Sequence, residues 1–125
     1  MADLENMAFL KLRPVTDTRL TEQVTPLLCP GETIMQQYQG IRDGVLFTDR
    51  RIIAVNTQGF TGRKKAFVVM PYSRIQAYSI ESAGVIDFDS EVRIWLAGLG
   101  MATFELVAGA DIFALARLIG SGVPT

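Results

Sequence analysis

The residue types that most often carry enzyme chemistry are scarce in this sequence. It contains no histidine, which excludes catalysis by Ser-His or Cys-His pairs and metal binding by imidazole. Cys29 is the single cysteine, so neither an intrachain disulfide nor a cysteine-based metal site can form. Its neighbours Leu27, Leu28 and Pro30 are apolar, which is typical of a buried, unreactive thiol. We therefore expect no catalytic residue, no metal and no cofactor, in a protein that is not an enzyme.

A second group with potential chemistry is the set of alternating carboxylates Asp87, Asp89 and Glu91. On a strand they would share one face, where they could bind calcium or act as an acid–base pair. A calcium loop needs more oxygen ligands and usually a glycine at its turn, and this spacing supplies neither. Because charged side chains are mostly exposed, we interpret these three as solvated residues at the start of a strand.

Arg63, Lys64 and Lys65 form a basic run that follows Phe60 in a predicted loop. Clustered basic side chains are attracted to anionic lipid, so these three residues are the candidate anionic-surface patch. Polybasic membrane segments usually have about four to eight charges, which makes membrane binding the alternative rather than the leading hypothesis. The formal net charge of −1 argues against a nucleic-acid partner, since polyanion-binding domains are markedly basic.

The composition predicts a small domain with more apolar surface than a single subunit can bury. Hydrophobic residues make up 49% of the 125 residues and charged residues 20%, against about 25% charged in an average domain. Large apolar patches are rare on soluble monomers, and symmetric self-association would cover them, so we expect a homo-oligomer. Asp3 and Glu5 stand where a signal peptide is positively charged, and no apolar window is long enough to span a membrane. We expect a cytoplasmic protein.

The hydrophobic pattern divides the chain into an N-terminal extension over residues 1–16 and one domain over residues 17–122. The domain is predicted to open with a short helix capped by Asp17 or Thr18. This helix should end or kink near Pro26, because proline lacks the backbone donor that a helix interior requires.

From Glu32 onward the apolar residues alternate, which predicts about seven short strands separated by glycine-containing or polar turns. Residues 110–119 then have the spacing of an amphipathic helix. Its apolar stripe consists of Ile112, Leu115, Leu118 and Ile119. We predict a mainly β fold, an antiparallel barrel whose open end is capped by this C-terminal helix.

Four segments of this pattern, in order and at similar spacing, resemble the small bacterial pleckstrin-homology (PH) domain family. They are LFTDRRII at 46–53, QGFTGRK at 58–64, PYSRI at 71–75 and DFDSEVRIW at 87–95. Within them we interpret most residues as architectural, and we expect Trp95 in the core.

The resemblance implies a PH-like barrel of seven antiparallel strands with a C-terminal helix, no known catalysis, and assembly into ring-like homo-oligomers. Lipid-binding relatives use a basic signature between their first two strands. Here that loop has only Arg42, next to Asp43, which departs from the pattern. The leading hypothesis is a module that homo-oligomerises and serves as a scaffold or protein-interaction unit, with an unknown protein partner. The alternative is peripheral binding of anionic lipid through Arg63, Lys64 and Lys65.

Overall fold

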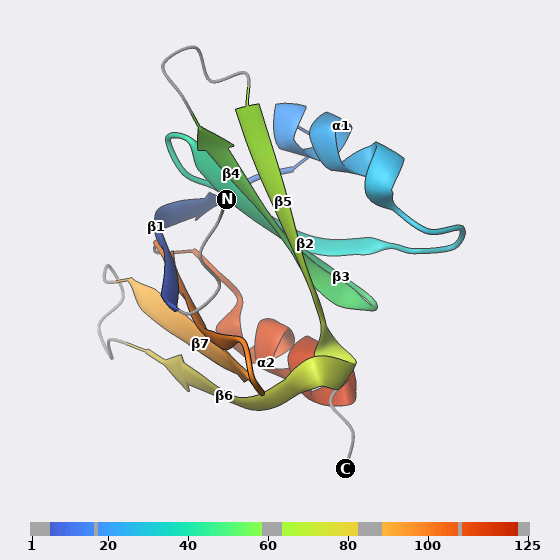
Figure 1. The fold of residues 1–125 in the computed structure, drawn as a ribbon. Helices are drawn as coiled ribbons and strands as arrows, with labels where there is room; N and C mark the ends of the chain where they lie inside the picture. The colour runs from blue at the N-terminus through green and yellow to red at the C-terminus, as the bar shows by residue number, and fades with distance from the viewer. Residues whose placement is uncertain (1–5, 17, 59–63, 83–88, 108, 123–125) are drawn as a thin grey trace.

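The computed structural model describes residues 6–16, 18–58, 64–82, 89–107 and 109–122. These ranges contain eight strands, two α-helices and two short 3-10 helices (Figure 1). The strands are β1 Asn6–Pro14, β2 Ile34–Gln39, β3 Asp43–Thr48, β4 Arg51–Gln58, β5 Lys64–Pro71, β6 Ile75–Glu81, β7 Ser90–Leu96 and β8 Gly100–Leu106. The helices are α1 Arg19–Val24, η1 Thr25–Leu27, η2 Tyr72–Arg74 and α2 Ile112–Gly122. The mainly β prediction with a C-terminal helix is confirmed.

All eight strands belong to one curled sheet in the order β5-β4-β3-β2-β1-β8-β7-β6. Neighbouring strands are antiparallel except β1 and β8, which pair in parallel. The predicted count of seven antiparallel strands was therefore wrong by one strand. The additional strand is β1, which lies within the segment 1–16 that the sequence predicted to be an extension. In the structure, residues 6–14 are part of the sheet.

A bulge explains why β1 is hard to recognise in the sequence. Its register against β8 shifts between Phe9 and Leu12, and Lys11 has φ 53, in the left-handed region that L residues seldom adopt. Phe9 and Leu12 are three residues apart, so without the bulge their side chains would point to opposite faces. With it both are buried, and Leu10 is left 60% exposed.

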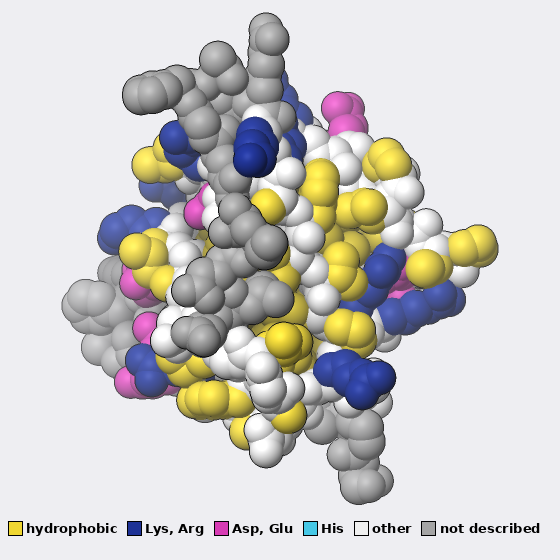
Figure 2. Space-filling view, in the orientation of Figure 1, with side chains coloured by type: hydrophobic (Ala, Val, Ile, Leu, Met, Phe, Trp, Pro, Cys, Tyr) yellow, Lys and Arg dark blue, Asp and Glu magenta, His cyan; other side chains and the backbone are white. Residues whose placement is uncertain are grey.

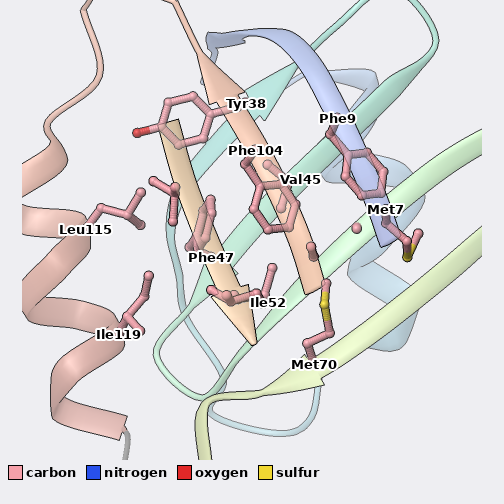
Figure 3. Close-up of a cluster of buried hydrophobic side chains, with 14 of the residues drawn as sticks. Met7, Phe9, Tyr38, Val45, Phe47, Ile52, Met70, Phe104, Leu115 and Ile119 are labelled. Atoms are coloured by element: carbon pink, nitrogen blue, oxygen red, sulfur yellow. The ribbon is translucent and has the colours of Figure 1, made fainter. Parts of the chain in front are cut away.

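The main core fills the inside of the curled sheet. Phe9 of β1 stacks on Phe104 of β8 with ring centroids 5.3 Å apart, and Phe47 of β3 meets Phe104 edge-on at 5.9 Å. Leu115 and Ile119 of α2 point into this cluster and close it (Figure 3). Burying this apolar stripe is the main contribution of α2, as its spacing predicted.

A second, smaller core lies on the outer face of the sheet, under α1. Leu20 and Val24 of this helix pack on Leu46, Ile53 and Val55 of β3 and β4. The predicted N-terminal helix is thus present, and it changes to the 3-10 turn η1 where Pro26 interrupts it. Among the described residues, none of the helices has the length and hydropathy to cross a membrane.

Candidate functional site

The sheet ends in two edge strands, β5 and β6, each of which has a neighbouring strand on one side only. On β5, Val68 and Met70 face the main core, so Phe67 and Val69 face outward. Their cross-strand neighbours Val55 and Ile53 are covered by α1. Phe67 and Val69 each remain 39% exposed. Hydrophobic side chains accordingly reach the surface along the middle of this face (Figure 2).

The other edge strand, β6, is exposed along most of its length. Its inner positions are Tyr78 and Ile80, which lie opposite Ile94 and Val92 of β7. Ala77 and Ser79 point outward and are small, so little side-chain bulk covers the outer face at this edge.

Three glutamates form one row across the outer face beside this edge. Glu81 of β6 lies opposite Glu91 of β7, and Glu91 lies opposite Glu105 of β8. Directly opposed like charges destabilise a sheet. Arg93 in the next row offsets part of this repulsion, since its Nη2 is 2.6 Å from Oε1 of Glu91. We name Glu81, Glu91 and Glu105 the glutamate row.

The carboxylates singled out in the sequence lie next to this row. Asp87 falls outside the described residues, whereas Asp89 and Glu91 line a hollow of about 250 Å³ that also includes Glu81 and Glu105. No group of described residues has the arrangement of a metal site. Sequence reasoning missed Glu81 and Glu105, because only the cross-strand register brings them to Glu91.

The basic run lies at the start of β5. Arg63 is outside the described residues, Lys64 is exposed, and Lys65 is half-buried. Successive strand residues point to opposite faces, so the side chains of Lys64 and Lys65 leave the strand in opposite directions. Lys65 is on the outer face, in the same row as Thr57 and in line with Phe67 and Val69.

A polar pocket of about 200 Å³ lies on this outer face, between α1 and the β2–β3 turn. Lys65, Arg19 and Arg42 bring three basic side chains to its wall, together with the carboxylate of Asp43. Burial raises the pKa of Asp43, while a backbone hydrogen bond from Thr57 and the charge of Arg42 act in the opposite direction. Arg19 was not identified from the sequence, because it lies far from Lys65 along the chain.

The turn at 48–51 is architectural, as predicted. The Thr48 hydroxyl accepts hydrogen bonds from the backbone N–H groups of Arg50 and Arg51, both at 3.0 Å, and donates to Oε2 of Glu32 at 2.7 Å. The Tyr72 hydroxyl donates to the Thr48 carbonyl at 2.6 Å. These bonds tie the β3–β4 turn to the loop before β2 and to η2.

Two predictions about single side chains were wrong. Cys29 is exposed rather than buried, because it lies in the loop after η1, where Arg51 Nη2 is 3.8 Å from its sulfur. Trp95 is half-buried and outside the core clusters. The register of β7 places Ile94 and Leu96 inward, so Trp95 faces outward between Ala77 and Met101.

The chain resembles proteins with the same architecture over most of its length. A family model described as "Bacterial PH domain" matches residues 3–123. Two curated proteins of Bacillus subtilis (strain 168) are similar: "Uncharacterized protein YjqA", 42% identical over 77 residues, and "Uncharacterized protein YozO", 31% identical over 105 residues. The match spans 62% of this chain and 62% of YjqA, and 84% of this chain and 86% of YozO.

Solved structures support the same assignment. A DUF1696 family protein with a pleckstrin-homology domain from Shewanella loihica PV-4 superposes with a TM-score of 0.75 at 29% identity, over 91% of this chain and 98% of that one. A pleckstrin homology domain from Shewanella amazonensis SB2B gives 0.62 at 28% identity, over 86% and 90% of the two chains. This chain belongs to the bacterial PH domain family.

Proposed function

We propose that this chain is a non-catalytic PH-like module that assembles with copies of itself and serves as a scaffold or protein-interaction unit. The observation that carries this proposal is the apolar stretch from Ala66 to Met70 in the middle of the edge strand β5. Phe67 and Val69 in this stretch are each 39% exposed. The family resemblance, which implies ring-like homo-oligomers, supports the same reading.

Native sheets have to protect their edge strands from pairing with other chains. Edge strands usually have charges, prolines or bulges that prevent uncontrolled pairing with other chains. β5 has such residues at its ends, Lys64 and Lys65 at the start and Pro71 at the finish, but none in its centre. An uncharged β-prone segment on an open edge is an aggregation hazard unless a defined partner covers it. A second copy of the chain would cover it and complete its backbone hydrogen bonds.

Light scattering coupled to size-exclusion chromatography tests this proposal. We expect a mass that is a multiple of the 13.7 kDa subunit mass. Val69→Lys should shift the mass toward a single subunit, because it places a charge in the centre of the β5 edge. Leu10→Lys is the matched control, since Leu10 is also exposed but lies in the central strand β1. A wild-type mass of one subunit, or a Val69→Lys variant that assembles like the wild type, would overturn the proposal.

The second candidate function is binding of an anionic surface through Arg63, Lys64 and Lys65. The observation that favours it is the pocket that brings Arg19 and Arg42 to Lys65. Co-sedimentation with vesicles of phosphatidylcholine, alone or mixed with phosphatidylglycerol, separates the two candidates. Lipid binding requires salt-sensitive sedimentation with the anionic vesicles that is lost in the triple variant Arg63→Glu, Lys64→Glu, Lys65→Glu. Equal sedimentation with both vesicle types would exclude it.

A further inference from the structure

We propose that the polar pocket between α1 and the β2–β3 turn binds a phosphate monoester carried on a small hydroxyl-bearing group. The residues that line this pocket come from α1, from the β2–β3 turn and from the four strands β2, β3, β4 and β5. The site does not depend on the proposed self-assembly. It also differs from the anionic-surface candidate, because Lys65 lines the pocket whereas its neighbour Lys64 does not.

Close packing of α1 on β3 creates the pocket. A Cβ built on Gly44 would lie 2.7 Å from Cδ1 of Leu20, so the missing side chain lets this leucine approach the backbone of β3. Arg19 precedes Leu20 in the helix, and the same packing brings Arg19 to the pocket wall. Val55 lies opposite Gly44 on β4 and forms the apolar part of the lining together with Leu20.

The wall of this pocket has an excess of positive charge. Arg19, Arg42 and Lys65 supply three positive charges. Asp43 supplies the one negative charge among the lining residues, which leaves a net charge of +2 in a chain whose formal net charge is −1. A phosphate monoester has a charge of about −1.5 to −2 near neutral pH and therefore balances this excess. The planar guanidinium groups of arginine also match the geometry of phosphate oxygens.

The volume of the pocket limits the group that carries the phosphate. The pocket measures about 200 Å³, whereas sites for drug-sized ligands usually measure about 300–1,000 Å³. A phosphate on a short carbon chain fits a space of this size, and a nucleotide is too large for it. The volume therefore favours a small phosphate ester.

Other polar residues of the lining suit the hydroxyl groups of such an ester. Ionised Asp43 accepts hydrogen bonds, and Gln39 and Thr57 are able both to donate and to accept them. A carboxylate repels a bare phosphate ion, but it accepts a strong hydrogen bond from a hydroxyl group of the ligand. The presence of Asp43 among the cations therefore favours a hydroxyl-bearing ester over inorganic phosphate.

A purely structural role accounts for fewer of these charges. The charge of Arg42 lowers the pKa of Asp43 against the effect of burial, so these two neighbours offset each other. Arg19 and Lys65 add two further positive charges to the same hollow, more than the single carboxylate of Asp43 neutralises. They come from α1 and β5, whereas the basic signature of lipid-binding relatives lies in the loop between two strands. The pocket is therefore a separate site from that signature.

Isothermal titration calorimetry of the full chain with glycerol 3-phosphate tests the site. The wild type should bind one molecule of this ester per chain. Arg19→Ala and Lys65→Ala should each weaken binding at least about tenfold, because each removes a hydrogen bond to a charged group. Lys64→Ala is the matched control, since it removes the same charge from the adjacent residue on the opposite face, and it should bind like the wild type. Circular dichroism checks that each variant is folded.

The charge of the ligand gives a second readout. Dimethyl phosphate has one negative charge and should bind at least about tenfold more weakly than glycerol 3-phosphate. Binding of glycerol 3-phosphate should strengthen as pH rises through about 6, where the monoester loses its second proton. Asp43→Asn should strengthen the binding of inorganic phosphate, because it removes the repelling carboxylate. Equal affinity for the monoester and for dimethyl phosphate would overturn the proposal.

Vesicles that contain phosphatidic acid show whether the monoester is free or part of a lipid. Co-sedimentation with these vesicles that is lost in Arg19→Ala would assign the site to a lipid headgroup. Binding in the calorimeter without co-sedimentation would assign it to a soluble ester. Absence of both kinds of binding would overturn the inference and leave the proposed self-assembly standing. Binding that Arg19→Ala and Lys65→Ala leave unchanged, or that Lys64→Ala weakens as much as they do, would overturn it too.

Discussion

Arg51 holds Glu32 in a two-point ion pair: its Nε is 2.9 Å from Oε2 and its Nη2 is 2.8 Å from Oε1. The Glu32 side chain is completely shielded from solvent. The pKa of Glu32 is lowered to about 2, mainly by the hydrogen bond from Arg51 and further by those from Thr48 and the backbone N–H of Cys29. Burial of the carboxylate acts in the opposite direction and raises the pKa. This pair fastens the start of β4 to the loop that precedes β2.

We expect the Glu32 pair to make stability depend on pH in the acid range. The pKa of Glu32 is depressed in the folded state, so its stabilisation is fully present above its unfolded value of 4.5 and is lost as pH falls toward about 2. The effect should be about 2 kcal/mol, because Arg51 keeps some solvent contact that screens the pair. Urea titrations between pH 6 and pH 2 measure it. In the Glu32→Gln variant the free energy of unfolding should depend less on pH over this range. The same pH dependence in the variant and the wild type would contradict the assignment of the effect to Glu32.

Arg51→Lys should lower the free energy of unfolding by about 1–2 kcal/mol, because lysine cannot reproduce the two parallel hydrogen bonds to Glu32. It also loses the bond from Nη2 to the Leu27 carbonyl, 2.7 Å away. Arg50→Lys is the control, since Arg50 is exposed and its ion pair with Asp49 is long, at 4.0 Å. Urea denaturation compares the two. Equal decreases in the free energy of unfolding for the two variants would mean that the two-point geometry of the Arg51–Glu32 pair adds no stability.

Gly44→Ala should destabilise the packing of α1 on the sheet. A Cβ at this position would lie 2.7 Å from Cδ1 of Leu20, closer than two carbon atoms can approach. We expect a loss of about 1–3 kcal/mol, in line with other overpacked cores. Leu20→Ala removes both the clash and the packing that Leu20 contributes to the outer core. The double variant should therefore lose less free energy of unfolding than the sum of the losses in the two single variants. Thermal unfolding measures these losses. If the losses of the two single variants simply add in the double variant, the contact between position 44 and Leu20 is contradicted.

Lys11→Gly should raise the free energy of unfolding by about 0.5–1 kcal/mol, because glycine adopts the φ of 53 at this bulge without steric cost. The same change at Arg13, in the regular part of β1, should lower stability, since glycine there only adds chain entropy to the unfolded state. Chemical denaturation of both variants provides the comparison. A destabilised Lys11→Gly variant would show that the lysine side chain contributes more than the backbone strain costs.

The elements that the sequence predicts well are those with purely local signals. The stripe of α2 and the polar turn at 48–50 could be recognised because each is encoded by neighbouring residues. β1 escaped recognition because the bulge at Lys11 breaks the alternation that defines a strand. The position of Trp95 was predicted wrongly because alternation along a strand shows only that the strand has two faces. Which face points inward depends on how the strand pairs and packs in the sheet.

The candidate site was the least predictable part for the same reason. Glu81, Glu91 and Glu105 come from three strands, and their opposition depends on cross-strand register, which no local pattern encodes. Lys64 and Lys65 are adjacent in the sequence, but their side chains leave β5 on opposite faces of the sheet, which a basic run in the sequence does not reveal. The resemblance to the family supplied the fold and left these surface relationships open.

The parallel pairing of β1 with β8 sets the order of events during synthesis. The end of β1 pairs with β2, which follows soon after it in the chain. Met7 lies opposite Ala102, so the first part of β1 finds its hydrogen-bonding partner almost a hundred residues later. Loop closure of this length is entropically costly and slows folding. Until β8 emerges, Phe9 lacks its stacking partner Phe104, and the nascent chain must keep β1 away from other copies. The parallel part of the sheet and the aromatic stack of the main core can therefore form only after residues 100–106 have been synthesised.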